Sequence, residues 1–108
     1  MKPLLAFALV AVAASVSPSP GPAKPAARII TVVVDKLAFG PVPADLHVGD
    51  SIVWDNRDLF RHSATAPGHF DVDLPPGAKR RMIFRRPGAF PFTCKYHPGM
   101  KGVFQVSR

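Results

Sequence analysis

The stretch Cys94-Lys95-Tyr96-His97-Pro98-Gly99-Met100 contains the only cysteine of the chain, one of its four histidines and one of its three methionines. A thiol, an imidazole and a thioether therefore follow one another at the spacing C-x-x-H-x-x-M. Soft sulfur ligands select copper(I), zinc or iron–sulfur clusters, whereas imidazole suits zinc and copper. Two histidines and one cysteine with a weak axial methionine are the ligand set of blue-copper electron-transfer sites. The stretch supplies one histidine, so a second must come from elsewhere, and His62 is the best candidate.

The residues on both sides of this stretch have the pattern of β-strands. Before it, Phe90, Phe92 and Cys94 alternate with other residues, so that all three would lie on one face of a strand. Pro91 within this strand implies an edge position or a bulge, because proline cannot donate to the ladder. After the stretch, residues 102–107 are expected to form a closing strand. Two strands joined by a tight loop can bring the three ligands to one point.

No segment of the chain has the pattern of a helix, and the fold is expected to be all-β. Short β-prone runs separated by glycine and proline turns lie at residues 29–34, 37–39, 51–54, 63–65, 79–84, 89–93 and 103–106. About seven to eight short strands punctuated in this way predict a β-sandwich or barrel.

The N-terminal part of the chain differs in composition from the rest. A short positive start, Met1-Lys2, precedes an apolar run from Leu4 to Val16, which is typical of a secretory signal peptide. The run is shorter than the about 20 residues of a transmembrane helix, although an uncleaved anchor is the alternative. We therefore expect a signal peptide over residues 1–23 with an open cleavage position, and export to the periplasm. A proline-rich linker and first strand over 24–35, and a copper-binding domain over 36–108, are expected to follow.

The pattern as a whole resembles the cupredoxins, which are small blue copper proteins. The resemblance runs from about residue 36 to residue 106 and is carried by residues 48–54, Asn56, Asp58, His62, Phe70-Asp71, Pro76-Gly77, Pro87-Gly88 and the stretch 94–100. The spacing of the three ligands within that stretch is most similar to that of the amicyanins, the shortest spacing in the family.

This resemblance implies a Greek-key β-sandwich with one type 1 copper per chain. The implied ligands are His62, Cys94 and His97, with Met100 as the weak axial ligand. The chain departs from the family at one position. Many cupredoxins have asparagine directly after the first histidine ligand, where it tethers the cysteine strand, and this chain has Ser63 there.

Each candidate ligand also has an alternative interpretation. Cys94 could be a buried structural thiol, or the nucleophile of a Cys–His pair that would need an orienting group. Met100 could be a core methionine, and the two histidines could be ordinary surface residues. Zinc is the competing metal, but structural zinc sites prefer four cysteine or histidine ligands. His47 and His69 fall outside the pattern and are expected to be exposed and unliganded.

The chain has a net charge of +7, and five of its 14 lysine and arginine residues lie within residues 79–86. We call this group the basic cluster, which consists of Lys79, Arg80, Arg81, Arg85 and Arg86. It could be a solvated strand face, or it could steer an acidic redox partner toward the protein. Nucleic acid would also suit such a cluster, but an exported copper protein rarely meets it.

Together these features predict a periplasmic, monomeric type 1 copper protein that is not an enzyme. It would carry single electrons between redox protein partners, such as a c-type cytochrome or a dehydrogenase. The resemblance implies that His97 is the electron exit, within an apolar docking patch that includes Phe60. The alternative is a copper carrier or buffer. An enzyme would need further copper centres, and the chain lacks additional histidine clusters for them.

Overall fold

The computed structural model describes residues 2–19, 21 and 26–108, so that part of the expected linker lies outside the described residues. Residues 2–19 and 21 contain neither helix nor strand. Among all described residues, nine strands and no helix are found, which confirms the all-β prediction. Consequently no helix of this part of the chain is long and apolar enough to cross a bilayer.

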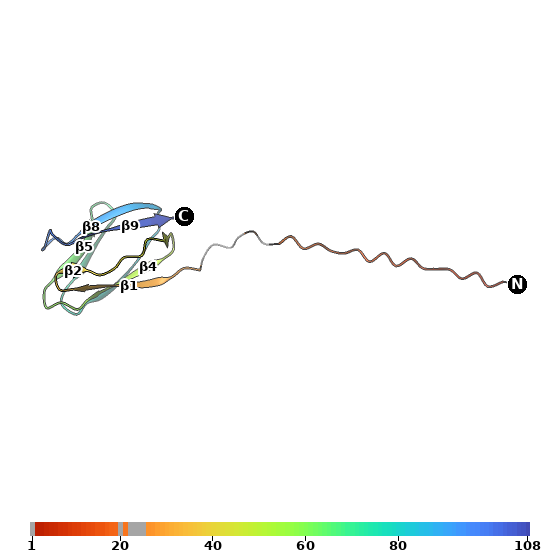
Figure 1. Cartoon of the computed structure of the whole chain (residues 1–108), viewed down its shortest axis with the longest axis horizontal. Coiled ribbons are helices and arrows are strands. Elements are labelled where there is room, and N and C mark those ends of the chain that lie inside the picture. Colours follow the sequence, from red (N-terminus) through yellow and green to blue (C-terminus); the bar gives the residue numbers. More distant parts are fainter. Residues whose placement is uncertain (1, 20, 22–25) are drawn as a thin grey trace.

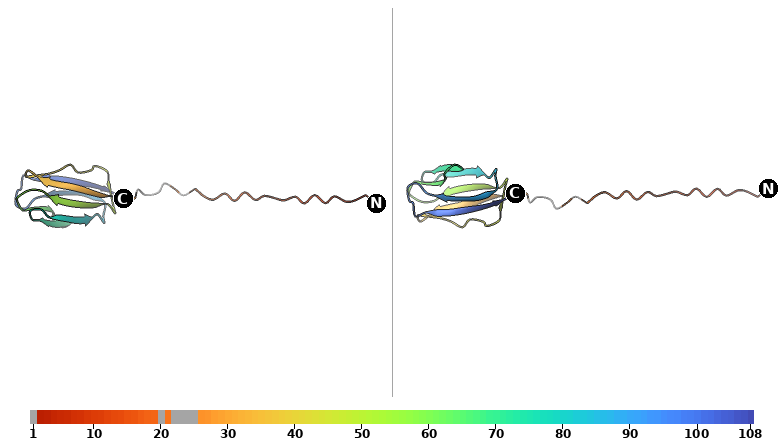
Figure 2. Two further views of the ribbon diagram at one scale, coloured as in Figure 1. Left: turned by 90° about the horizontal axis from the view of Figure 1, so that it is seen from below. Right: turned by 90° about the horizontal axis from the view of Figure 1, so that it is seen from above.

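The strands form two mixed sheets that pack face to face (Figures 1 and 2). The four-stranded sheet has the order β2-β1-β4-β7 and consists of β1 (Ile29–Asp35), β2 (Ala38–Phe39), β4 (Ser51–Asn56) and β7 (Lys79–Ile83). The five-stranded sheet has the order β3-β9-β8-β5-β6 and consists of β3 (Leu46–His47), β5 (His62–Ala66), β6 (Phe70–Leu74), β8 (Gly88–Thr93) and β9 (Lys101–Ser107). The pairs β1–β4 and β3–β9 are parallel, and the other pairs are antiparallel.

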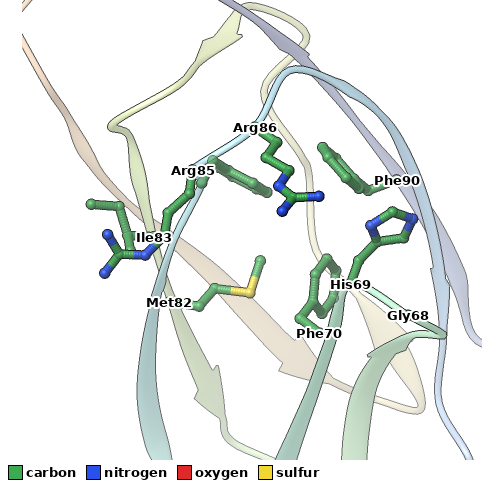
Figure 3. Close-up of a pocket in the computed structure, with 9 residues that line it drawn as sticks. Gly68, His69, Phe70, Met82, Ile83, Arg85, Arg86 and Phe90 are labelled. Atoms are coloured by element: carbon green, nitrogen blue, oxygen red, sulfur yellow. The ribbon is translucent and has the colours of Figure 1, made fainter.

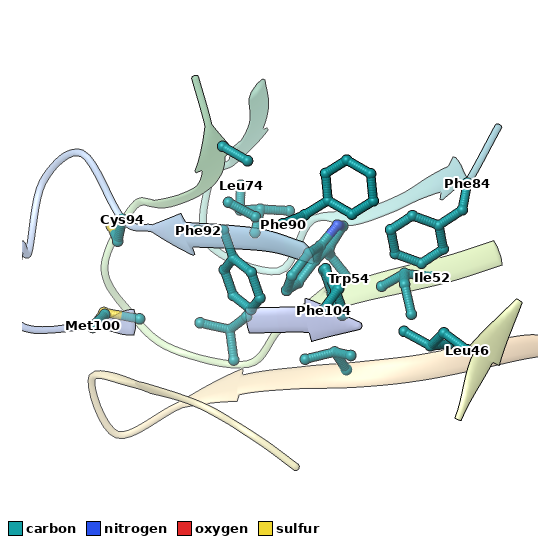
Figure 4. Packing of buried hydrophobic residues seen from close by; sticks show 14 of the residues in the cluster. Leu46, Ile52, Trp54, Leu74, Phe84, Phe90, Phe92, Cys94, Met100 and Phe104 are labelled. Atoms are coloured by element: carbon teal, nitrogen blue, oxygen red, sulfur yellow. The ribbon is translucent and has the colours of Figure 1, made fainter. Parts of the chain in front are cut away.

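Alternating side chains from both sheets fill the space between them. Trp54 of β4, Phe92 of β8 and Phe104 of β9 are fully buried, with ring centroids 4.7 to 5.6 Å apart (Figure 4). Burying each such side chain stabilises the fold by about 1.5–3 kcal/mol. Phe90, Phe92 and Cys94 are all buried, as their alternation predicts. The aromatic core therefore runs along β8 directly to the cysteine.

Two positions of β8 show how this strand reaches the cysteine. Phe92 pairs with Gly102 of β9, and a Cβ atom on Gly102 would overlap the Phe92 ring, so only glycine fits there. Pro91 does not lie on an edge strand, because β8 stands between β9 and β5. The only register pair between β5 and β8 is Thr65 with Thr93, so the missing amide of Pro91 falls where the β5 ladder is absent.

The two ends of the sandwich differ. We call the end where β8 finishes and β5 begins the site end, because Cys94 and His62 lie there. The opposite end, where β5 finishes and β8 begins, is called the far end. Ile29, the first residue of β1, pairs with Ser51, which in turn pairs with Ile83, so the chain enters the domain at the far end.

Candidate metal centre

Three of the four candidate ligands meet at the site end. Cys94 follows β8, His62 is the first residue of β5, and His97 lies on the loop between β8 and β9. The Sγ atom of Cys94 is 3.8 Å from Nδ1 of His62 and 3.9 Å from Nδ1 of His97. The ligand atoms of all three residues lie within 4.8 Å of one another, and within the described part of the chain no other group of three or more His, Cys, Asp or Glu residues does so. The loop and the distant upstream histidine therefore converge as the sequence predicts.

Met100 closes the loop that carries Cys94 and His97. Its backbone N–H donates to the carbonyl of His97 at 2.9 Å, and its carbonyl accepts from the N–H of Cys94 at 3.2 Å. The Met100 side chain is buried and lies at the same end of the core as Cys94 (Figure 4). The thioether is thus near the group of three, and its axial role stays a prediction.

The environment of Cys94 favours the thiolate. Burial alone would raise the pKa of this thiol. The N–H of Ser63 points to Sγ at 3.4 Å, and this hydrogen bond lowers the pKa together with those from His97, His62 and the Tyr96 amide, to about 6. Because the thiolate is the form of cysteine that binds metal, the site is prepared for a metal ion near neutral pH.

Ser63 also resolves the one departure from the family pattern. Its Oγ accepts a hydrogen bond of 2.9 Å from the backbone N–H of Lys95, the residue after the cysteine. The same Oγ lies 2.9 Å from the hydroxyl of Thr65, which donates to Asp71 at 2.9 Å. Ser63 therefore tethers the cysteine segment to β5, through its hydroxyl and its amide, at the position where many cupredoxins use asparagine.

Asp58 contacts one of the candidate ligands, a role that was not predicted from the sequence. Its Oδ2 lies 2.8 Å from Nε2 of the fully buried His62 and accepts from the N–H of Leu37 at 2.9 Å. The pKa of Asp58 is held below its usual range, first by the Leu37 amide and then by His62. A carboxylate on Nε2 fixes the tautomer in which Nε2 carries the proton, and Nδ1 then faces Cys94 with its lone pair. The one sequence feature that could have indicated this contact is the position of the carboxylate, four residues before a candidate histidine ligand.

The loop between β4 and β5 is held by the buried side chain of Asn56. Its amide nitrogen donates to the carbonyls of Phe60 and Leu74 at 2.9 and 2.8 Å, and its oxygen accepts from the N–H of Asp58 at 2.9 Å. Because all these groups belong to the scaffold, the position of Asp58, and through it that of His62, is fixed before any metal binds.

The surface at the site end is apolar around His97. The imidazole of His97 is half-buried, whereas His62, Cys94 and Met100 are buried. The Phe60 ring is half-exposed, with its centroid 6.1 Å from that of His97, and Tyr96 and Leu59 are also exposed. Of the four candidate ligands, His97 is therefore the one that reaches the surface.

The remaining histidines take no part in this centre. His69 is exposed, as predicted, whereas His47 is half-buried on β3, where its backbone N–H donates to Asp50 at 2.9 Å. A pair of imidazoles, a thiolate and a nearby thioether suit copper, since sulfur ligands match Cu(I) and imidazole matches both oxidation states.

The sequence matches the family model of the cupredoxin-like domain over residues 4–106, and the chain belongs to this family. Copper is thus confirmed as the cofactor that the family implies, and His62, Cys94 and His97 form the potential copper site.

Solved structures of two kinds are similar to this chain. A copper-containing nitrite reductase from Thermus scotoductus SA-01 is 29% identical, with a TM-score of 0.64 over 73% of this chain and 22% of that chain. Two proline-to-glycine variants of amicyanin, one a reduced Cu(I) form at pH 4 and one oxidised, are 23% and 21% identical, with TM-scores of 0.63 and 0.65 over 73% of this chain and 82% of theirs. The chain spans only about a fifth of the nitrite reductase, and the amicyanin likeness establishes the fold.

Proposed function

We propose that this chain is a periplasmic type 1 copper protein that carries single electrons between redox protein partners. The observation that supports this most is the convergence of Cys94, His62 and His97 within 4.8 Å at the end of a rigid β-sandwich. In this proposal these three residues are the equatorial ligands and Met100 is the weak axial ligand. Copper bound there supplies a reversible one-electron change between Cu(II) and Cu(I).

The protein's contribution is to hold the ligands in one geometry and to expose one of them. Cys94 is pre-set as a thiolate by the Ser63 amide, and His62 is fixed by Asp58. Backbone hydrogen bonds hold His97 and Met100 on a closed loop. Ligands that barely move between oxidation states keep reorganisation small, and half-buried His97 beside Phe60 offers a short path to a docked partner.

The basic cluster supports acidic partners. All five of its side chains are exposed on the edge strand β7 and the residues after it, and none forms an ion pair with a carboxylate in the described residues. Uncompensated cations of this kind raise the association rate with an acidic surface. We take a c-type cytochrome or a dehydrogenase as the partner class.

Export and the absence of catalysis belong to the same proposal. Residues 1–23 act as the signal peptide and 24–35 as the linker and first strand, which N-terminal sequencing of the mature periplasmic protein would test. The likeness to nitrite reductase covers 22% of that chain, so its reaction is not carried over. A mature protein that retains residue 4, or one that reduces nitrite at its single centre, would contradict these parts of the proposal.

Stopped-flow mixing of the reduced protein with an oxidised c-type cytochrome tests electron transfer against copper carriage. We expect rapid oxidation with copper retained. Phe60→Ser, beside His97, should slow the reaction about tenfold, which corresponds to about 1.4 kcal/mol and identifies Phe60 as one of the few interface residues that carry most of the binding energy. His69→Ser at the far end is the matched control and should have no effect. If copper passed to a Cu(I) chelator faster than electrons passed to the cytochrome, the copper-carrier function would be favoured instead.

A further inference from the structure

A second site lies at the far end of the sandwich, away from the metal centre. A groove of about 480 Å³ opens there between the edge strands β6 and β7, and its walls include Phe70, Met82, Phe84, Arg85, Arg86 and Phe90 (Figure 3). Sites for small molecules typically have volumes of about 300–1,000 Å³. The groove is therefore large enough for a ligand of one or two aromatic rings.

The floor of the groove is preformed. Phe84 and Phe90 are buried, and their rings stack with centroids 6.1 Å apart and an interplanar angle of 22°. Phe84 also packs edge-on against Phe104 of the central core, at 5.0 Å. Because the floor is continuous with the core, a planar apolar ligand would find rigid aromatic faces without first paying for their ordering.

A defined turn sets one side of the rim. Pro67 and Gly68, the latter with a φ of +80°, together with the 2.9 Å hydrogen bond from the N–H of His69 to the carbonyl of Ala66, have the pattern of a type II turn. This turn sets the His69 ring edge-on against Phe90 at 4.9 Å.

On the other side of the groove, backbone hydrogen bonds fix the point where the chain leaves β7. The N–H of Phe84 donates to the carbonyl of Asp50 at 2.9 Å, and the carbonyl of Phe84 accepts from the N–H of Gly49 at 2.8 Å. In Figure 3 the Arg86 guanidinium group reaches over the groove toward the aromatic floor, and Arg85 turns toward Ile83.

The charge of the groove selects the ligand. No carboxylate is among the lining residues, and in the described chain neither Arg85 nor Arg86 forms an ion pair. A guanidinium group is always charged, and its planar fork matches a carboxylate. From this combination we infer that the far-end groove binds a small aryl carboxylate, with its ring on Phe84 and Phe90 and its carboxylate on Arg86.

This inference does not depend on the proposed metal centre, although Arg85 and Arg86 also belong to the basic cluster. The groove shares no residue with the metal centre, and the two lie at opposite ends of β8. A ligand bound there should leave the visible absorption of the copper-loaded protein unchanged. Failure of one proposal is therefore distinguishable from failure of the other.

NMR titration of the copper-loaded protein in its Cu(I) state with 2-naphthoate tests the inference. We expect saturable shifts at Phe90, His69 and the Met82 methyl group. Arg86→Gln should weaken binding at least about tenfold, which corresponds to about 1.4 kcal/mol for one charge-assisted contact. Neutral 2-naphthylmethanol should bind the unchanged protein more weakly by a similar factor. Arg81→Gln removes the same charge from β7 outside the groove, and should change the affinity less than about twofold because its effect is screened by salt.

Three results would overturn the inference. The first is an absence of saturable shifts, and the second is equal binding by the Arg86→Gln and Arg81→Gln variants. The third is a set of shifts that centres on His97 and Phe60 rather than on the groove. If the first result is found and an acidic peptide instead gives saturable shifts at the groove, the site belongs to a protein partner and the small-molecule assignment is wrong.

Discussion

Replacing Asp58 tests whether this carboxylate holds the buried histidine in place. Asp58→Ala removes the acceptor of the His62 Nε2–H, which has no other hydrogen-bond partner in the described residues. Asp58→Asn keeps an acceptor of similar shape but removes the charge. The same carboxylate oxygen also accepts from the Leu37 amide, which lies in an exposed turn. In the Asp58→Ala variant, water can take over as the acceptor for the Leu37 amide, but it cannot reach the buried His62.

The expected magnitude follows from the burial of His62. Leaving one buried donor without a partner costs about 1–3 kcal/mol, so Asp58→Ala should lower the free energy of unfolding by that amount. Asp58→Asn exchanges a charge-assisted hydrogen bond for a neutral one and should cost about 1 kcal/mol. In a domain of this size each kcal/mol lowers Tm by about 4–8 °C.

Chemical denaturation of the metal-free protein measures these differences. Asp73→Ala is the matched control, since Asp73 forms only a half-exposed ion pair with Arg61 at 3.6 Å, and it should change stability by less than about 1 kcal/mol. In the copper-loaded protein, Asp58→Asn should also raise the reduction potential, because removing a negative charge near the metal disfavours Cu(II). Equal stability of the Asp58→Ala and Asp73→Ala variants would refute the reasoning.

Further predictions concern the strand, the axial ligand, the thiol and the charge. Gly102→Ala should destabilise the protein by about 1–3 kcal/mol in denaturant, because its methyl group would overlap the Phe92 ring, whereas Gly99→Ala meets open space and should be neutral. Met100→Leu should still bind copper while its potential shifts, and complete loss of copper would contradict the axial role. In the metal-free folded protein the pKa of Cys94 is lowered to about 6, whereas in the unfolded chain it is about 8.5. The thiolate should therefore stabilise the fold fully above a pH of about 8.5, and this stabilisation should be lost as the pH falls through about 6. Cys94→Ser, followed by denaturation across the same pH range, should lack that component. Association with an acidic partner should slow as salt shortens the screening length from about 10 Å at 0.1 M to about 3 Å at 1 M, and a rate insensitive to salt would leave the basic cluster as a solvated face.

The parts of the fold that were predictable from sequence depend on local spacing. Alternation at Phe90, Phe92 and Cys94 gave the buried face of β8, because strand geometry has a period of two residues. The loop from Cys94 to Met100 could be assigned because a seven-residue stretch between two strands leaves few ways to arrange its ligands. The upstream His62 was proposed because the loop supplies only one histidine, and the family resemblance implied the same residue, but no local spacing identifies it.

What was missed depends on residues that only the fold brings together. Asp58 has its role because the turn at Leu37 and the start of β5 meet on its carboxylate, and they are 21 and four residues away in sequence. For Pro91 the sequence predicted an edge position or a bulge but not the gap in the β5–β8 ladder that accommodates it, because that gap is a property of the sheet. The strands β2 and β3 are two residues long and carry no periodicity to detect.

Titration of the metal-free protein with Cu(II), followed by visible absorption, tests whether the loop from Cys94 to Met100 holds a type 1 copper. We expect one equivalent of copper per chain to produce an intense blue band, because the Cys94 thiolate transfers charge to copper. Cys94→Ser should abolish the band, whereas His69→Gln, at the far end, should leave it unchanged. A protein that remains colourless with bound copper, or a Cys94→Ser variant that turns blue, would contradict the assignment of this loop as a type 1 copper site.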